Sequence, residues 1–289
     1  MKLSKAQNQR DKFVKIDGLK IRYRDEGYGR PIVLLHGGAI GTSLEIFETI
    51  IPSLIENGYR CISFDQPGFG MSEIPLSDRK ATRSYRNQVT SKLMKKLKLS
   101  DVVLVGHSQG GGNVGQIILD KNPLCTAAIF LCAGICLPPS ERFKPGAIVD
   151  RHRNFLVEPD RKDIIKFLEY NLYNHDLITD ELIENRLKYS IGDKYEYFVR
   201  FRKIVPDVDY YMWAKFITVD VPMMFIFGAS DNVRDDAKIR LMKLRALYPY
   251  GRFTYHLFEK CKHYPHWDQP ELTVSTVLNF LQKHPKTVV

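Results

Sequence analysis

The hydrophobic positions of this chain alternate between short continuous runs and longer mixed segments. Continuous apolar runs favour strands that are buried on both faces, and they lie at 31–37, 61–65, 101–107 and 126–133. The mixed segments between them predict helices, which lie at 43–57, 84–98 and 109–121. This alternation is typical of an α/β fold, in which helices cover both faces of a mostly parallel sheet.

The two ends of the chain extend this pattern. Residues 12–17 and 20–25 alternate polar and apolar side chains on either side of Gly18, which predicts an antiparallel hairpin. The C-terminal part adds two predicted strands and a final helix, at 221–231, 252–259 and 270–283. Counted together, these runs predict an eight-stranded sheet.

The alternation stops in the middle of the chain. Segments there have helical spacing and no strand pattern, and Thr179 is typical of an N-cap that begins an amphipathic helix. A helical block inserted between strands predicts a lid. We therefore expect a core domain formed by residues 1–136 and 217–289, and a helical lid formed by residues 137–216.

Composition places the chain among ordinary globular proteins, because 44% of its 289 residues are apolar and 26% are charged. No segment approaches the roughly 18 apolar residues that span a membrane. The charged N-terminal segment lacks the apolar centre of a signal peptide, so we expect a cytoplasmic protein. The five cysteines form no CxxC pair and no zinc-type cluster, which predicts reduced thiols and no bound metal.

The net charge of +10 raises the question of a nucleic-acid or membrane partner. Lysines and arginines are scattered along the chain, and only 92–100 is dense in them. Because that run places its cations around a helix, we interpret it as a solvated helix face. The sequence thus predicts neither partner, and it leaves room for a mild attraction of acidic substrates.

The first candidate for chemistry is Ser108 in the sequence GHSQG. A serine between two glycines, after a strand and before a helix, is typical of a nucleophile elbow. Gly106 and Gly110 would let the backbone pass close to its neighbours in this tight turn. A structural turn without chemistry is the alternative, and a base and an acid elsewhere in the chain would favour the nucleophile.

A serine nucleophile needs a base, and the base needs a carboxylate that orients it. Asp231 follows the apolar stretch MMFIFG and His263 follows the run at 252–259, in the chain order expected after such a serine. Each would lie at the carboxyl end of a strand, as Ser108 does. The alternatives are Asp235 and Asp236 as the acid, which a solvated helix start explains better, and His266 or His256 as the base.

Two backbone N–H groups would have to stabilise an oxyanion formed on the substrate. Gln109 directly follows the serine, and the loop after the strand at 31–37 offers Gly38 or its neighbour Ala39. Small residues in that loop would let the backbone approach a substrate. The turn-rich sequence DQPGFGMS at 65–72 predicts an architectural loop that shapes the floor of the pocket.

Taken together, these motifs resemble the α/β-hydrolase superfamily along nearly the whole chain. Within it, the chain looks most like the meta-cleavage-product hydrolases, because of its lid sequence and the Cys-x-His-aromatic motif at 261–264. The resemblance implies that Arg186 grips a substrate carboxylate and that Ala39 and Tyr264 contact substrate. The chain departs from the family's usual pattern at Ala39 and Ile40, and it has Tyr264 where tryptophan is usual.

The resemblance implies an α/β-hydrolase fold and a serine hydrolase that uses an acyl-enzyme and no cofactor. The substrate would be a small carbonyl compound such as a 2-hydroxy-6-oxo-hexa-2,4-dienoate, cut at a carbon–carbon bond. A carboxylesterase, lactonase or thioesterase is the first alternative. The second is a non-hydrolytic member of the fold, such as a ligand receptor, a cofactorless oxygenase or a haloperoxidase. Family members also suggest a homodimer.

Overall fold

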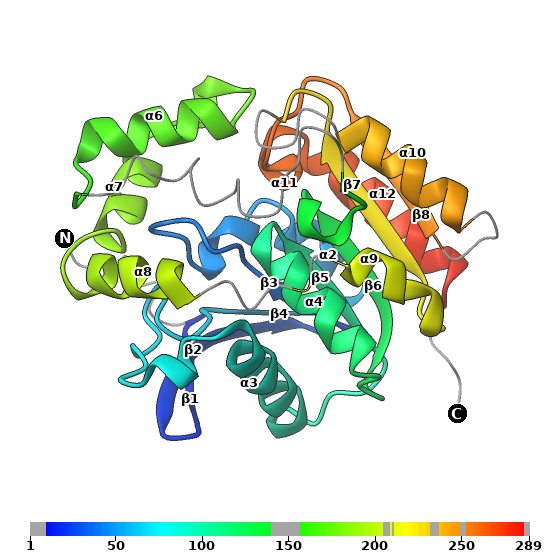
Figure 1. Ribbon diagram of the computed structural model, residues 1–289, viewed down its shortest axis with the longest axis horizontal. Helices are drawn as coiled ribbons and strands as arrows, with labels where there is room; N and C mark the ends of the chain where they lie inside the picture. Colours follow the sequence, from blue (N-terminus) through cyan, green and yellow to red (C-terminus); the bar gives the residue numbers. More distant parts are fainter. Residues whose placement is uncertain are drawn as a thin grey trace.

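The protein is built around one eight-stranded sheet in the order β1-β2-β4-β3-β5-β6-β7-β8 (Figure 1). The computed structural model describes residues 10–139, 157–204, 209, 211–231, 237–248 and 253–285. β1 and β2 pair antiparallel with each other, β2 is antiparallel to β4, and all other neighbours are parallel. The strands are Lys12–Ile16, Leu19–Gly27, Arg30–Leu35, Tyr59–Phe64, Val102–His107, Cys125–Leu131, Met223–Gly228 and Phe253–Phe258.

Helices cover both faces of this sheet because neighbouring strand residues point to opposite sides. Val33 and Leu35 pack into one apolar cluster with α3, α4, α9 and α10, while Ile32 and Leu34 pack into a second one with α2 and α12. These helices are α2 (Ile51–Glu56), α3 (Arg83–Lys96), α4 (Gln109–Leu119), α9 (Met212–Lys215), α10 (Ala237–Leu247) and α12 (Pro270–Lys283). The predicted α/β architecture, a mostly parallel eight-stranded sheet with helices on both faces, is therefore confirmed.

The helix predicted over 43–57 is wrong in its extent. The structure has a 3₁₀ turn at Leu44–Phe47 and then the short helix α2, with Pro52 in its first turn. Proline has no N–H and its ring clashes with the carbonyl four residues earlier, so a continuous helix cannot pass through this position. A helix can begin there, and α2 does.

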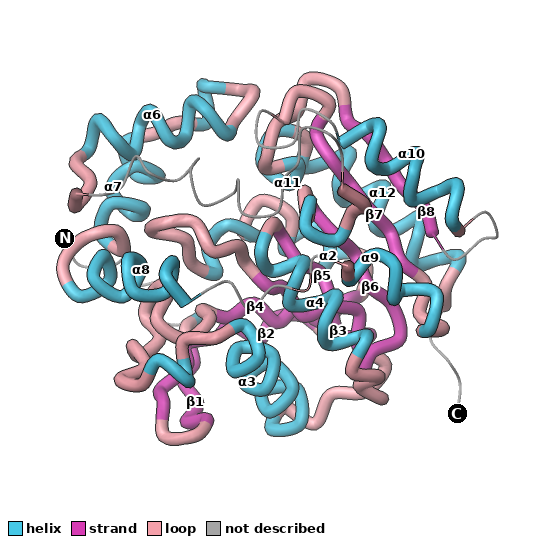
Figure 2. Tube along the Cα trace, in the orientation of Figure 1, coloured by secondary structure: helices cyan, strands magenta, loops and turns pink. Residues whose placement is uncertain are grey.

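Three helices, α6 (Arg161–Asn171), α7 (Asp180–Lys188) and α8 (Asp193–Ile204), lie in the chain between β6 and β7. We call them the cap helices; they lie together at one end of the sheet (Figures 1 and 2). The Thr179 hydroxyl accepts from the Leu182 N–H at 3.2 Å, which confirms the predicted N-cap of α7. Residues 140–156 of the predicted lid lie outside the described residues, and its bounds stay a prediction.

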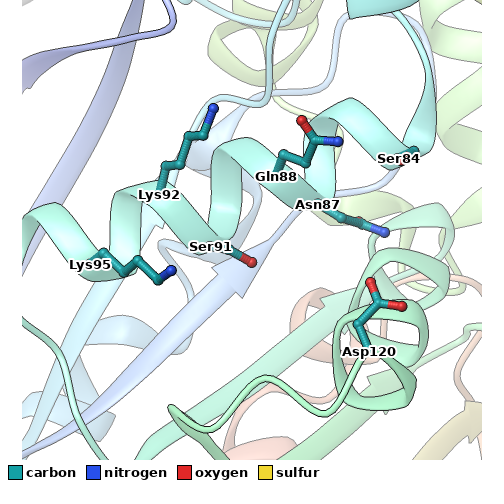
Figure 3. Close-up of a pocket in the computed structure, with 7 residues that line it drawn as sticks. All are labelled: Ser84, Asn87, Gln88, Ser91, Lys92, Lys95 and Asp120. Carbon is teal, nitrogen blue, oxygen red and sulfur yellow. The ribbon is translucent and has the colours of Figure 1, made fainter.

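The lysine-rich run at 92–100 behaves as a solvated face, because its lysines are exposed while Leu93, Met94 and Leu99 are buried. A polar hollow of about 260 Å³ opens beside it, between α3 and the end of α4 (Figure 3). It is lined by Ser84, Asn87, Gln88, Ser91, Lys92, Lys95 and Asp120. Ser108 lies at the opposite end of α4, so this hollow is separate from the predicted nucleophile.

Among the described helices, none is both long and apolar enough to cross a bilayer.

Candidate active site

Ser108 occupies a strained turn between β5 and α4, with φ = 54° and ψ = −118°. A non-glycine residue with positive φ is uncommon and costs free energy, so the surrounding chain has to hold it there. The Ser108 N–H donates to the Leu131 carbonyl on the neighbouring strand at 2.8 Å, and the Ser108 carbonyl accepts from the Gly111 N–H at 3.1 Å. These bonds fix the backbone and project the side chain from the carboxyl edge of the sheet.

The flanking glycines are required by close backbone contacts. A Cβ at Gly106 would lie 2.5 Å from the Gly110 carbonyl oxygen, and a Cβ at Gly110 would lie 2.2 Å from the Leu35 carbonyl oxygen. Backbone atoms cannot move aside as the end of a flexible side chain can. The glycine spacing around Ser108 therefore has a packing reason that is independent of chemistry.

His263 lies between Ser108 and Asp231 and bonds to both. Its Nε2 is 3.1 Å from the Ser108 Oγ, and its Nδ1 is 2.9 Å from the Asp231 Oδ2. Asp231 and His263 are buried, whereas Ser108 is partly exposed. In this order the carboxylate keeps the proton on Nδ1, and Nε2 is left to accept the hydroxyl proton.

The loops after β7 and β8 meet because Gly228 lets them approach. A Cβ at Gly228 would lie 2.2 Å from the Lys262 carbonyl oxygen, so only glycine fits there. The Ser230 N–H donates to the Cys261 carbonyl at 2.9 Å and ties the acid loop to the histidine loop. On its other side, the His263 N–H donates to the carbonyl of Asn171, the last residue of α6, at 3.0 Å.

The other candidates for the base and the acid lie elsewhere or make other contacts. His266 is buried, and neither ring nitrogen has a hydrogen-bond partner within the described part of the chain. Burial, followed by the nearby His263, lowers the pKa of His266 to about 3. His256 is exposed on β8. Asp235 and Asp236 lie outside the described residues.

The loop after β3 packs directly against the serine turn. A Cβ at Gly37 would lie 3.1 Å from the Ser108 Cβ, and one at Gly38 would lie 2.0 Å from the Gln109 Oε1. Gln109 begins α4, where the first N–H groups have no partner within the helix. The predicted donors, Gly38 and Gln109, are thus brought together beside the serine, and Ala39 follows in the same loop.

Arg186 reaches the site from α7 of the cap helices. It is buried, its Nη2 donates to the Tyr264 hydroxyl at 3.3 Å, and its guanidinium lies 4.4 Å from the centre of the Phe167 ring. Its Nε has no hydrogen-bond partner within the residues that the structure describes. Tyr264 is buried with its ring against His107 and His263, so it links Arg186 to the histidine.

Comparison with known protein families identifies the family of this chain. A family model described as the alpha/beta hydrolase fold matches residues 30–270, which is most of the chain. The chain belongs to the alpha/beta hydrolase family. Similar proteins that match most of the chain are named hydrolases, and the protein is an enzyme of this class.

Similar proteins from several bacteria carry one name, 2-hydroxy-6-oxononadienedioate/2-hydroxy-6-oxononatrienedioate hydrolase. One from Pseudomonas sp is 25% identical over 268 residues, covering 91% of this chain and 92% of the relative. One from Escherichia coli K12 is 27% identical over 278 residues, covering 92% of each. The predicted resemblance to meta-cleavage-product hydrolases is confirmed.

Solved structures agree on the fold. A meta-cleavage product hydrolase has a TM-score of 0.80 at 24% identity, covering 96% of this chain and 99% of its own. A bromoperoxidase from Bacillus anthracis has a TM-score of 0.79 at 21% identity, covering 94% of this chain and 99% of its own. An esterase from Exiguobacterium antarcticum has a TM-score of 0.75 at 20% identity, covering 93% of this chain and 98% of its own.

In this hydrolase, the loop at 65–72 anchors a cap helix as well as the core. The Asp65 carboxylate accepts from the Leu44 and Met71 N–H groups, each at 2.7 Å. From α8, the Lys194 ammonium donates to the Ser72 carbonyl at 2.7 Å and the Tyr197 hydroxyl donates to the Pro67 carbonyl at 3.0 Å. The loop therefore joins the sheet to the cap helices, a role that its turn-rich sequence did not predict.

Lys194 gives this contact a pH dependence. Burial lowers its pKa from 10.5 to about 8, although Asp65 and Asp193 act in the opposite direction. Between these two pH values the unfolded chain binds more protons than the folded one, so the free energy of unfolding should rise with pH. The expected rise is about 2 kcal/mol, less than the full shift implies, because Lys194 keeps some solvent contact.

The test compares urea unfolding of the wild type and Lys194→Met from pH 7.5 to pH 10.5. Titration of the other lysines and tyrosines cancels in the difference between the two proteins. The wild type should gain stability relative to the variant across this range. If the free energies of unfolding of the two proteins changed in parallel with pH, burial would not lower the pKa of Lys194.

We call Ser108, His263 and Asp231 the triad. One residue beside two of its members was not predicted from the sequence. Cys132 follows β6 at the same edge of the sheet, and its thiol lies in one cluster with Asp231 and His263. It was interpreted only as a buried thiol. The rule that carboxyl ends of parallel strands share an edge could have placed it near the site, but cysteine at that position carries no recognisable motif.

Proposed function

We propose that this hydrolase cleaves the carbon–carbon bond of a 2-hydroxy-6-oxo-hexa-2,4-dienoate that carries a further carboxylate. The observation that supports the chemistry best is the continuous chain of contacts from Ser108 through His263 to Asp231. The names of the relatives, which specify dienedioates and trienedioates, support the substrate class. Arg186, buried beside the histidine loop, supports an acidic substrate.

In the attack step, His263 takes the hydroxyl proton as the Ser108 oxygen attacks the substrate carbonyl carbon. Asp231 holds the ring in the tautomer that makes this transfer productive and stabilises the cation that forms. The negative charge that develops on the carbonyl oxygen is met by the N–H groups of Gln109 and Gly38. Both lie in backbone segments that the contacts around Ser108 hold in place.

Carbon–carbon cleavage adds one requirement to ester chemistry, because the leaving group is a carbanion. The dienol first shifts to its keto form, so that the electron pair of the broken bond is delocalised into the adjacent unsaturated keto acid. The cationic His263 gives its proton to the leaving carbon, and an acyl-enzyme remains on Ser108. Water activated by His263 then releases the acid and restores the serine.

Arg186 would bind the substrate carboxylate. A guanidinium forms two parallel hydrogen bonds to a planar carboxylate, and such charged bonds are the strong ones. One edge of Arg186 already donates to the Tyr264 hydroxyl, and its Nε has no partner in the described structure. A buried cation with an unused donor, next to the histidine loop, is suited to an anionic ligand.

An ester, lactone or thioester hydrolase is the second candidate. It would use the same serine, histidine and oxyanion donors, and it would need no keto shift. The residues that favour it are Ala39, Ile40 and Tyr264, where the chain departs from the pattern of the carbon–carbon hydrolases.

Two substrates assayed on the purified protein decide between these candidates. One is a 2-hydroxy-6-oxo-hexa-2,4-dienoate, followed by loss of its visible absorbance, and the other is a short p-nitrophenyl ester. We expect the dienoate to be consumed at a rate well above that of the ester. Ester turnover with an untouched dienoate would replace the carbon–carbon assignment with the esterase assignment.

Replacing Arg186 by alanine tests the carboxylate contact. We expect kcat/KM to fall about 100-fold for a substrate with the extra carboxylate and much less for a neutral ester, because a lost charged hydrogen bond is worth about 2–3 kcal/mol. Arg161→Ala is the matched control, since Arg161 lies on the exposed surface of α6 and pairs with Asp180 and Glu184. Equal losses on both substrates would place Arg186 in a structural role.

A further inference from the structure

Cys132 lies where it can complete a metal-binding set with two residues of the triad. The Cys132 Sγ, an Asp231 carboxylate oxygen and a His263 ring nitrogen lie within 4.8 Å of one another, and all three residues are buried. Cys132 has φ = 47°, a left-handed conformation that cysteine rarely adopts. Its backbone N–H donates to the Ile226 carbonyl at 2.8 Å, so the strained residue is held by the neighbouring strand.

We propose that Cys132, Asp231 and His263 form an inhibitory site for a soft divalent cation such as Zn²⁺ or Cd²⁺. Thiolate, imidazole nitrogen and carboxylate oxygen are the ligands that zinc takes in proteins, at about 2.0–2.3 Å. With bonds of this length, ligand atoms around a tetrahedral ion are separated by roughly 3–4 Å, so the three side chains need to approach one another only slightly. The cation would act as an inhibitor, and catalysis would not require it.

The thiol is the component that resists this binding. Burial, with the charge of Asp231 beside it, raises the pKa of Cys132 well above the usual value of a thiol. In the absence of a metal the residue therefore stays protonated and donates to the Lys262 carbonyl at 3.6 Å. A divalent cation displaces this proton to solvent, and its charge also offsets the repulsion between thiolate and carboxylate.

Binding would disable the triad through the histidine tautomer. The nitrogen that faces Asp231 is Nδ1, which carries the proton when Nε2 faces Ser108. A cation on Nδ1 takes its lone pair, so the ring proton moves to Nε2. Nε2 then has no lone pair to accept the Ser108 proton, and the base is lost. One proton leaves the thiol, while the ring remains neutral.

Binding is measured in the Ser108→Ala background, where turnover does not interfere. Calorimetric titration with CdCl₂ or ZnCl₂ should show one tight site per chain, and cadmium should produce an ultraviolet thiolate absorption band. Cys132→Ala should weaken this site at least about 100-fold and abolish the band, since a direct ligand contributes more than an outer-shell partner. Cys61→Ala is the matched control, because Cys61 is another buried thiol, on β4.

His263→Gln provides a second variant and should weaken the same site, so the proposal remains testable if Cys132→Ala does not fold. Tight binding and a thiolate band that persist in either variant would overturn the proposal. In the wild type, ester hydrolysis should fall as the site fills and return after addition of a chelator, whereas Cys132→Ala should resist the same concentrations. This last measurement rests on the proposed function, but the titration does not, so failures of the two can be distinguished.

Discussion

Replacing Ser108 by alanine is expected to reduce hydrolysis by about 10⁴-fold or more. In the proposed mechanism the serine oxygen attacks the carbonyl carbon, so its loss would leave only the proposed oxyanion donors and substrate binding to lower the barrier. The fold should persist, because the bonds that hold this turn are made by the Ser108 backbone and not by its hydroxyl. Steady-state rates on the dienoate and the ester, with a thermal unfolding curve, measure both effects.

The same turn offers a control. Gln109→Ala keeps the backbone N–H that we propose as an oxyanion donor, but it removes the side chain that packs against Gly38. Its fall in rate should be far smaller than that of Ser108→Ala. A Ser108→Ala protein with near-wild-type turnover would remove the serine from the chemistry and leave the glycine-flanked turn as a packing feature.

Asp231→Asn should cost about 10⁴-fold in kcat while leaving substrate binding nearly unchanged. An amide at this position can donate to Nδ1, which favours the tautomer with the proton on Nε2, and that ring cannot accept from Ser108. The Asp231 Oδ2 lies 2.9 Å from Nδ1, so the substitution acts on the bond that sets the tautomer. Kinetics at several substrate concentrations separate kcat from KM.

Asp268→Asn is the comparison for this variant. Asp268 also contacts the histidine loop, through the Lys262 N–H at 2.8 Å, but it does not touch the ring. Asp268→Asn should lower the free energy of unfolding, and its fall in kcat should be far smaller than that of Asp231→Asn. If Asp231→Asn kept most of its activity, the orienting acid would have to be another group, and the triad assignment would fail at that residue.

Much of the fold was predictable because its determinants are local. Each of the eight predicted strands is present. The central strands are short apolar runs because both of their faces are covered, and the first two were predicted from alternating polar and apolar residues. The N-cap at Thr179 was predictable for the same reason, because a hydroxyl three residues before a backbone N–H acts within one turn. The helix over 43–57 was wrong because Pro52 lies inside this range, where a proline lets a helix begin but not continue.

The residues of the site were likewise predictable only where their determinants are local. The position of Ser108 follows from its own flanking sequence, since the glycines on either side are needed by the backbone contacts of one turn. Asp231 and His263 could be selected by chain order, but the choice between His263 and His266 depends on which ring reaches Ser108. That contact joins residues 155 positions apart, and the packing of two loops around Gly228 determines it.

The sequence by itself therefore determined the layers, the strand count and the serine turn, because hydrophobic period and glycine spacing act over a few residues. Only the tertiary structure decided the partners of the serine, the burial of Arg186 against Tyr264, and the position of Cys132 beside Asp231. It also revealed that the loop at 65–72 holds α8 through Lys194. Each of these contacts joins segments that are distant in the chain, and their distances are set by packing that no local pattern encodes.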